Sequence, residues 1–408
     1  MIVNYINSLE KKVEAYKLRY NSKPFVYFFK LVWWSFTYFI SKIFQLLLLK
    51  PNKNPNKLYI GVAMGGGFGD ILIGANYIQY LREYLSPLDI HIDCYSGNLG
   101  AAQNAFINSN IIDGLYRNWY HNKARKYDFY ISIIESFPNV INYNEQKIKK
   151  LSPKLWTLIE ECLKEEKVVE KTIKYHPKNN SAAYIASIIQ GRNRVQVNDV
   201  GNILGIKPTL KFMPNINVNE QETLKKFNLD NQKYITINRC VGELNSFWDS
   251  NKMWSLEYCN ELVAMIKAEF SNYKIIQIGH SLERSPIISN IDDCLVGKTN
   301  FEEAKVIIKN SILHIDGEGG LVHLRHALKG GTSIVLFGPT SSDFYGYPEN
   351  INIKTNACPH WCDWVINDWQ THCLNNNKHI CMNSITPNIV FEKVNSYLEK
   401  FERELYVK

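Results

Sequence analysis

The sequence has no excess of charge outside its first sixty residues. Residues 1–60 hold ten Lys and Arg against two Glu, which accounts for the whole formal net charge of +8. A basic face that could bind nucleic acid is therefore not indicated in the body of the protein, and no nucleic-acid partner is expected. The chain also has no short-period repeat and no low-complexity tract, which excludes a solenoid and a compositionally biased chain.

The sequence also lacks the cysteine pattern and the leader of a secreted protein. Nine cysteines are present, an odd number, and five of them are scattered through the chain. No apolar run near the start is followed by a small-residue cleavage site. Free cysteines inside apolar segments favour a reducing compartment over a disulfide framework. We therefore expect a cytoplasmic protein.

An uninterrupted apolar run of about twenty residues, which a membrane-spanning helix needs, is missing too. The most apolar stretch, residues 25–50, is broken by Lys30 and Lys42. Its ten aromatic residues and flanking lysines favour a helix at a membrane surface, peripheral on the inner face of the cell membrane. A helix packed on the body or on another subunit and a true span remain open. PNKNPNK at 51–57 predicts a linker.

Strands and helices alternate along the rest of the chain, which predicts parallel sheets covered by helices. The pattern starts at the apolar strand 58–63 and restarts near residue 233 after a Pro-containing, polar stretch at 207–232. The fold class expected is α/β, with two doubly wound Rossmann-like domains facing each other across a cleft. The predicted segments are a helical arm at 1–57, an N-terminal domain at 58–215 and a C-terminal domain at 216–408.

Four glycines form a turn at the start of the first expected helix, MGGGFGD at 64–70. Such a turn lets the backbone approach a ligand at a helix N-terminus. A nicotinamide-dinucleotide fingerprint needs glycine where Asp70 stands, so no NAD is expected. Asp70 is then either a general base facing the cleft or the N-cap of the helix. The glycines assigned to this acceptor-side loop are Gly66, Gly67 and Gly69.

A second glycine turn, DGEGGLVHLRHAL at 316–328, lies between an apolar strand and a helix. The backbone N–H groups of Gly319 and Gly320 and the helix dipole suit a diphosphate. Glu318 cannot bind phosphate favourably, so ribose hydroxyls are its expected partners. His323, one turn further, either reaches the ligand or is a satisfied core histidine.

Basic residues follow the first strand of the second series. Arg239 and Lys252 can neutralise a leaving diphosphate. Gly279, which ends the strand expected at 274–279, is counted with the donor-binding residues.

Four cysteines are crowded into a loop-like, aromatic segment, and they predict a tetrahedral structural metal site for Zn or Fe. Two disulfides or unrelated thiols are the alternatives. No catalytic metal is expected, because four sulfur ligands leave no open position. The predicted ligands are Cys358, Cys362, Cys373 and Cys381.

Taken together, these segments resemble the family of bacterial ADP-heptose:lipopolysaccharide heptosyltransferases, glycosyltransferase family 9, whose members have the GT-B fold. The resemblance rests on four stretches that stand in the family's order. They are GGGFGDILIGANYIQYLR at 65–82, WDSNKMWSLEYCNEL at 248–262, LVGKTNFEEAKVIIKNSILHIDGEGGLVHLRHAL at 295–328 and LFGPTSSDFYGY at 336–347.

The resemblance implies that Asp70 is the catalytic base, that Lys252 binds donor phosphate, and that His323 matches the family's histidine at the helix start. The family's usual Asp-Ser/Thr-Gly becomes Glu318-Gly319-Gly320, which removes a hydroxyl that meets the donor. The cysteine cluster is similar to a four-cysteine iron site in a branch that glycosylates proteins with heptose.

The function expected is inverting transfer of heptose or a related sugar from an ADP or other nucleoside-diphosphate donor to a hydroxyl group. The acceptor expected is a cell-envelope glycan or lipopolysaccharide, which includes lipid-linked acceptors. Three alternatives remain open: a protein O-heptosyltransferase, a sugar-nucleotide epimerase of the same fold, and a catalytically silent nucleotide-sugar-binding protein.

Overall fold

The computed structural model describes most of the chain beyond the predicted arm. The described residues are 54–117, 124–134, 137–173, 189–194, 199–206, 211–239, 250–280, 285–358 and 380–406, with Val32, Trp33, Phe36, Ile40, Asp363, Trp369, Gln370 and Cys373. Within these ranges no helix has both the length and the apolar character that crossing a membrane requires. The predicted arm lies outside the described residues except for residues 54–57 and four helical positions, which are exposed.

The N-terminal half, residues 54–206, is built on a five-stranded sheet. The strand order is β3-β2-β1-β4-β5, and all neighbours are parallel except β4 and β5, which are antiparallel. Its strands are β1 (Leu58–Met64), β2 (Ile90–Ser96), β3 (Gly114–Arg117), β4 (Phe129–Ile134) and β5 (Phe137–Tyr143). Its helices are α3 (Phe68–Leu85), α4 (Leu99–Phe106), α5 (Glu145–Leu151), α6 (Pro153–Ile173) and α9 (Val200–Ile203).

The C-terminal half, residues 211–406, contains a six-stranded parallel sheet in the order β11-β10-β9-β6-β7-β8. Its strands are β6 (Tyr234–Ile237), β7 (Lys274–Gln277), β8 (Asp293–Cys294), β9 (Leu313–Gly317), β10 (Ser333–Phe337) and β11 (Ile351–Lys354). Its helices are α10 (Glu220–Lys226), α11 (Leu256–Glu269), α12 (Phe301–Asn310), α13 (Gly320–Ala327), α14 (Ser342–Tyr345), α15 (Ile380–Asn383) and α16 (Pro387–Tyr406). Since β6 has β7 on one side and β9 on the other, the strand order reverses there, where α/β proteins commonly bind ligands.

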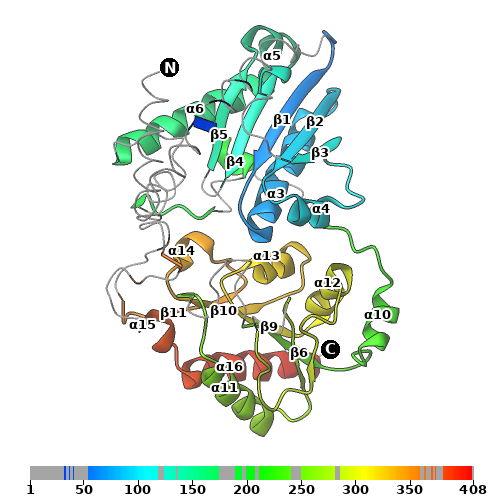
Figure 1. Ribbon diagram of the computed structural model, residues 1–408, viewed down its shortest axis with the longest axis vertical. Helices are drawn as coiled ribbons and strands as arrows, with labels where there is room; N and C mark the ends of the chain where they lie inside the picture. Colours follow the sequence, from blue (N-terminus) through cyan, green and yellow to red (C-terminus); the bar gives the residue numbers. More distant parts are fainter. Residues whose placement is uncertain are drawn as a thin grey trace.

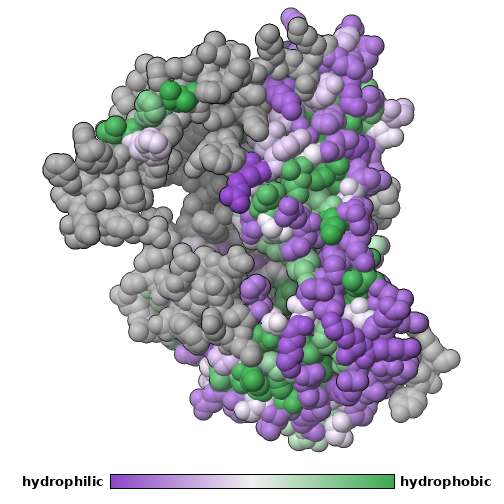
Figure 2. Space-filling view, turned by 45° about the vertical axis from the view of Figure 1, so that its right-hand side comes forward, coloured by the Kyte–Doolittle hydropathy of each residue, from purple (hydrophilic) through white to green (hydrophobic). Residues whose placement is uncertain are grey.

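The two halves lie one above the other in Figure 1, with α3 and α13 at their junction. The central strand β1 is buried along almost its whole length and packs its apolar residues on α3, as expected for an inner parallel strand. Residues 211–219 are anchored to both halves, since the amide N–H of Phe212 donates to Asn76 and Lys305 donates to the carbonyl oxygen of Asn215. Hydrophilic residues cover most of the described right-hand side of the molecule in Figure 2.

The α/β alternation predicted from sequence is confirmed, and the differences are local. Residues 145–173 form two helices, because Pro153 starts α6 directly after α5. The stretch 207–232 contains α10, whose first turn is capped by Asn219. The strands β3, β5, β8 and β11 were not predicted. The antiparallel β5 makes the first sheet mixed.

Candidate functional site

Asp70 stands in the first turn of α3, after the glycine turn that ends β1. Gly67 is the N-cap residue, so Asp70 is the third residue of the helix, and its Oδ2 accepts a hydrogen bond from the backbone N–H of Gly67. At Gly66, φ is +88°, and an added Cβ would lie 2.2 Å from Asp70 Oδ2, so only glycine fits there. The carboxylate thus completes the helix cap from within the helix rather than as the N-cap residue. Its side chain remains 22% exposed.

The second oxygen of the Asp70 carboxylate pairs with Arg194, a residue that no sequence motif had pointed to. The Nη1 atom of Arg194 contacts Asp70 Oδ1, and the Arg194 side chain is only 4% exposed. Its guanidinium carbon also lies 5.5 Å from the centroid of the Tyr345 ring, which is a cation–π contact. Asp70 therefore belongs to an ion pair that reaches α14 of the other half.

Glu318, Lys252 and His323 form a second charged group at the start of α13. The ammonium group of Lys252 pairs with Glu318 Oε2, and His323 Nε2 lies 3.5 Å from Glu318 Oε1. Burial by itself would raise the pKa of Glu318, but the charges of Lys252 and His323 outweigh it and hold that pKa well below its usual value of 4.5. The carboxylate expected to meet ribose is instead the buried counter-ion of Lys252.

His323 and Lys252 each also contact an aromatic residue. His323 Nδ1 lies 2.7 Å from the hydroxyl oxygen of Tyr347, and the ring is buried. The Lys252 ammonium lies 5.4 Å from the centroid of the Trp369 ring. His323 is thus a partnered, buried histidine, as one of the two sequence interpretations expected, and it also contacts the charged group.

The two charged groups meet because the first turns of α3 and α13 touch. A Cβ added to Gly69 would lie 2.2 Å from Cδ2 of His323, and one added to Gly320 would lie 3.7 Å from the backbone nitrogen of Gly69. Burial raises the pKa of Tyr345 and of Tyr347 far above the usual value, and both Asp70 and Glu318 add to the effect. Asp70 and Glu318 therefore share one electrostatic environment. Since both helices direct their N-termini here, the site favours an anion.

Arg239 and Gly279 lie beside the carboxyl end of β6. The Nε–H group of Arg239 donates to the carbonyl oxygen of Trp254 at 2.9 Å, so this side chain positions the segment that carries Lys252. A Cβ added to Gly279 would lie 3.4 Å from Asn238 Oδ1.

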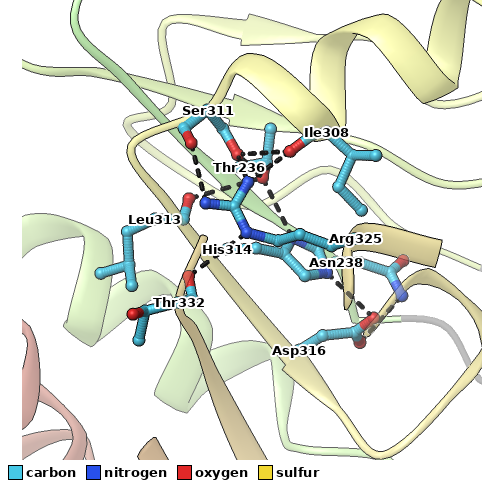
Figure 3. A network of polar contacts seen from close by, with 9 residues as sticks. All are labelled: Thr236, Asn238, Ile308, Ser311, Leu313, His314, Asp316, Arg325 and Thr332. Atoms are coloured by element: carbon cyan, nitrogen blue, oxygen red, sulfur yellow. Dashed lines mark hydrogen bonds and ion pairs between the residues drawn. The ribbon is translucent and has the colours of Figure 1, made fainter. Parts of the chain in front are cut away.

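A buried polar network lies next to this edge of the sheet (Figure 3). Asn238 donates to Asp316 at 2.9 Å, His314 Nε2 lies 3.3 Å from Asp316, and His314 Nδ1 lies 3.0 Å from the hydroxyl of Thr236. Burial raises the pKa of Asp316 although His314 acts against it. The network is closed by Arg325, whose guanidinium donates to Ser311 and to neighbouring carbonyl oxygens.

The predicted four-cysteine metal site is wrong. In the described part of the chain no three His, Cys, Asp or Glu side chains form a group that could hold a metal ion. Cys381 is a free thiol in this part of the chain, and Cys362 lies outside the described residues. Burial raises the pKa of the Cys381 thiol, and Cys358 and Cys373 add to the shift.

No protein-family model and no curated protein matches the chain. Among solved structures, the iron-containing heptosyltransferase TibC from enterotoxigenic E. coli, crystallised with ADP-D-β-D-heptose, aligns with a TM-score of 0.51 and 14% identity over 87% of this chain and 78% of TibC. A family 9 glycosyltransferase from Veillonella parvula aligns with a TM-score of 0.50 and 16% identity over 84% of this chain and 97% of its own. The chain has the fold of these glycosyltransferases. The GT-B architecture expected from the resemblance is thereby confirmed, and within it Asp70 comes from one half and Lys252 from the other.

Proposed function

We propose that the protein is an inverting glycosyltransferase that moves heptose or a related sugar from a nucleoside-diphosphate donor to a hydroxyl group. One observation carries the proposal: the contact between Gly69 and His323 brings a partly exposed carboxylate of one half beside the first turn of α13, where His323 and the positive end of the helix dipole lie. A transfer reaction needs a base on one side of the reacting carbon and a cationic environment for the leaving group on the other.

On the donor side, in the C-terminal domain proposed for residues 216–408, the diphosphate would meet the N–H groups of Gly319 and Gly320. Lys252 is the cation best placed to stabilise the charge that develops on the leaving diphosphate. To do so it has to leave Glu318 Oε2, and His323, 3.5 Å from the other oxygen, remains as a partner for that carboxylate. Arg239 holds the segment of Lys252 through the carbonyl of Trp254.

On the acceptor side, in the domain proposed for residues 58–215, the hydroxyl group donates its proton to Asp70 while its oxygen attacks the anomeric carbon. Each carboxylate oxygen has two lone pairs, so Asp70 can accept a further hydrogen bond besides those from Gly67 and Arg194. A single displacement without a covalent intermediate inverts the configuration. Most of the rate enhancement comes from positioning and charge stabilisation.

For the acceptor we propose a cell-envelope glycan or lipopolysaccharide. The proposal takes support from the overall resemblance, and TibC, crystallised with ADP-D-β-D-heptose, shares the fold. A protein hydroxyl is the alternative acceptor. An epimerase would instead convert the donor without any acceptor.

The test measures release of nucleoside diphosphate from ADP-D-β-D-heptose with and without lipopolysaccharide. We expect release that depends on the acceptor and falls by a factor of about 10² to 10⁴ in Asp70→Asn. Asp113→Asn is the matched control, since it removes a carboxylate paired with an arginine, Arg82, away from the junction. Conversion of donor alone would support an epimerase, and nucleotide binding without any conversion by a panel of nucleotide-sugars would support a silent binding protein.

A further inference from the structure

Arg194 lies between the two halves and contacts both. Its Nη1 atom pairs with Asp70 at the start of α3, and its guanidinium carbon lies 5.5 Å from the ring centroid of Tyr345 in α14. The side chain is 4% exposed. A guanidinium taken this far from water is stable only if its charge and its N–H groups are engaged. Its place therefore depends on the approach of α14 to α3.

The contact with Arg194 fixes the orientation of the Asp70 carboxylate. One hydrogen bond, from the Gly67 N–H to Oδ2, leaves the carboxyl group free to turn about χ2, a torsion with a broad energy minimum. A second contact, from Arg194 to Oδ1, removes that freedom. The remaining lone pairs then point in fixed directions, as a base that must meet one hydroxyl group requires.

The residue before Arg194 ties the same segment to the C-terminal half. The side-chain amide of Asn193 donates to the carbonyl oxygen of Gly346 at 3.0 Å and lies 3.4 Å from that of Asp343. Asn193 thus contacts backbone carbonyl oxygens near both ends of α14, and Arg194 contacts the ring of Tyr345 in the same helix. A shift of α14 away from the N-terminal half would carry Arg194 with it.

We propose that Arg194 is a positioning residue for Asp70, which couples the orientation of the base to the docking of the C-terminal half. The inference rests on the proposed function, because it takes Asp70 as the base. It extends that function by making α14 and the 193–194 segment part of the mechanism. Arg194 pairs with Asp70, whereas Lys252 pairs with Glu318, so we expect the loss of Arg194 to affect turnover and to spare nucleotide binding.

The experiment compares wild type, Arg194→Met and Arg194→Lys by three measurements: turnover of ADP-D-β-D-heptose, affinity for ADP by calorimetry, and thermal unfolding. We expect turnover to fall about 100-fold in Arg194→Met, with partial recovery in Arg194→Lys, which restores the charge but not the planar fork. The affinity for ADP should stay within about twofold of wild type. Arg192→Met is the matched control, since Arg192 lies on the same segment and pairs with Glu165 within the N-terminal half.

The inference is overturned if Arg194→Met turns over the donor as fast as the wild type. It is also overturned if Arg192→Met loses as much turnover, or if Arg194→Met loses affinity for ADP in parallel with turnover. A crystal structure of Arg194→Met decides the matter even if no donor is turned over. An Asp70 carboxylate that keeps its orientation there overturns the inference, and a rotated one supports it. A wild-type protein that converts no donor contradicts the proposed function, whereas an active wild type with an active Arg194→Met contradicts only this inference.

Discussion

Gly69 of α3 lies directly against the imidazole ring of His323 in α13, so that a Cβ at position 69 would come within 2.2 Å of Cδ2. The ring cannot easily yield, because it is buried and contacts both Tyr347 and Glu318. This contact joins the two first turns on which the candidate site depends.

Gly69→Ala should loosen the junction of the two halves. The added methyl group either displaces His323 or separates the helices, and overpacking of this kind costs about 1–3 kcal/mol of unfolding free energy. The urea concentration at the midpoint of unfolding and the turnover of ADP-D-β-D-heptose would both fall. Gly100→Ala in α4 is the control, because a Cβ there meets no atom within 4 Å and alanine favours a helix. If Gly69→Ala were as stable as Gly100→Ala, the close packing of Gly69 on His323 would be contradicted.

Lys252→Met should destabilise the protein by about 3 kcal/mol, because it leaves the buried Glu318 carboxylate without its ammonium partner. The double variant Lys252→Met with Glu318→Gln should recover much of this loss, since it removes the second charge as well. Chemical denaturation measures both, and affinity for ADP should fall in either variant. A double variant no more stable than Lys252→Met would show that the two charges are not coupled.

Stability should fall in acid partly because of Glu318. Its pKa in the folded protein lies below the usual value of 4.5, so the unfolded chain takes up the proton first as the pH falls. The stabilisation is therefore complete above about pH 5 and is lost progressively below it. Urea unfolding at a series of pH values from 7 to about 3.5 should give a flatter curve for Glu318→Gln. A Glu318→Gln curve parallel to that of the wild type would exclude this contribution.

Arg325→Met should strongly destabilise the C-terminal half. The buried guanidinium donates to the carbonyl oxygens of Ile308, Ser311 and Thr332, several of them at the end of α12 (Figure 3). Burial lowers the pKa of Arg325 to about 10, so it stays charged at neutral pH. Leaving these carbonyls unpaired should cost at least about 3 kcal/mol. Arg403→Met removes an exposed arginine that donates a hydrogen bond to the backbone carbonyl oxygen of Glu399. It should change stability little in the same denaturation assay.

The local pattern of residues was sufficient to predict much of the fold. Helix α12 (Phe301–Asn310) and strand β10 (Ser333–Phe337) are each set by their own apolar period and by capping or turn residues at their ends, all of which are local features of the sequence. Short edge strands such as β3 and β8 carry too few residues to show a period, and they form only because a neighbouring strand supplies hydrogen bonds.

The candidate site was predicted in part. Asp70, Glu318 and His323 stand at the two glycine turns, and Lys252 stands in the stretch 248–262 that carries part of the family resemblance. Arg194 gave no such signal, since its partner lies far away in the chain. The cysteine spacing misled, because spacing along the chain does not by itself create the geometry that a metal ion requires of its ligands.

By itself, the sequence determined the alternation of strands and helices and the two glycine turns, since these depend on neighbours within a few residues. It also determined the zero net charge of residues 61–408, which depends on composition alone. Only the tertiary structure decided that Arg194 pairs with Asp70, that Lys252 pairs with Glu318 and that Gly69 contacts His323. Such contacts depend on how two sheets and their helices pack together, and the energy of that packing is a sum over distant parts of the chain.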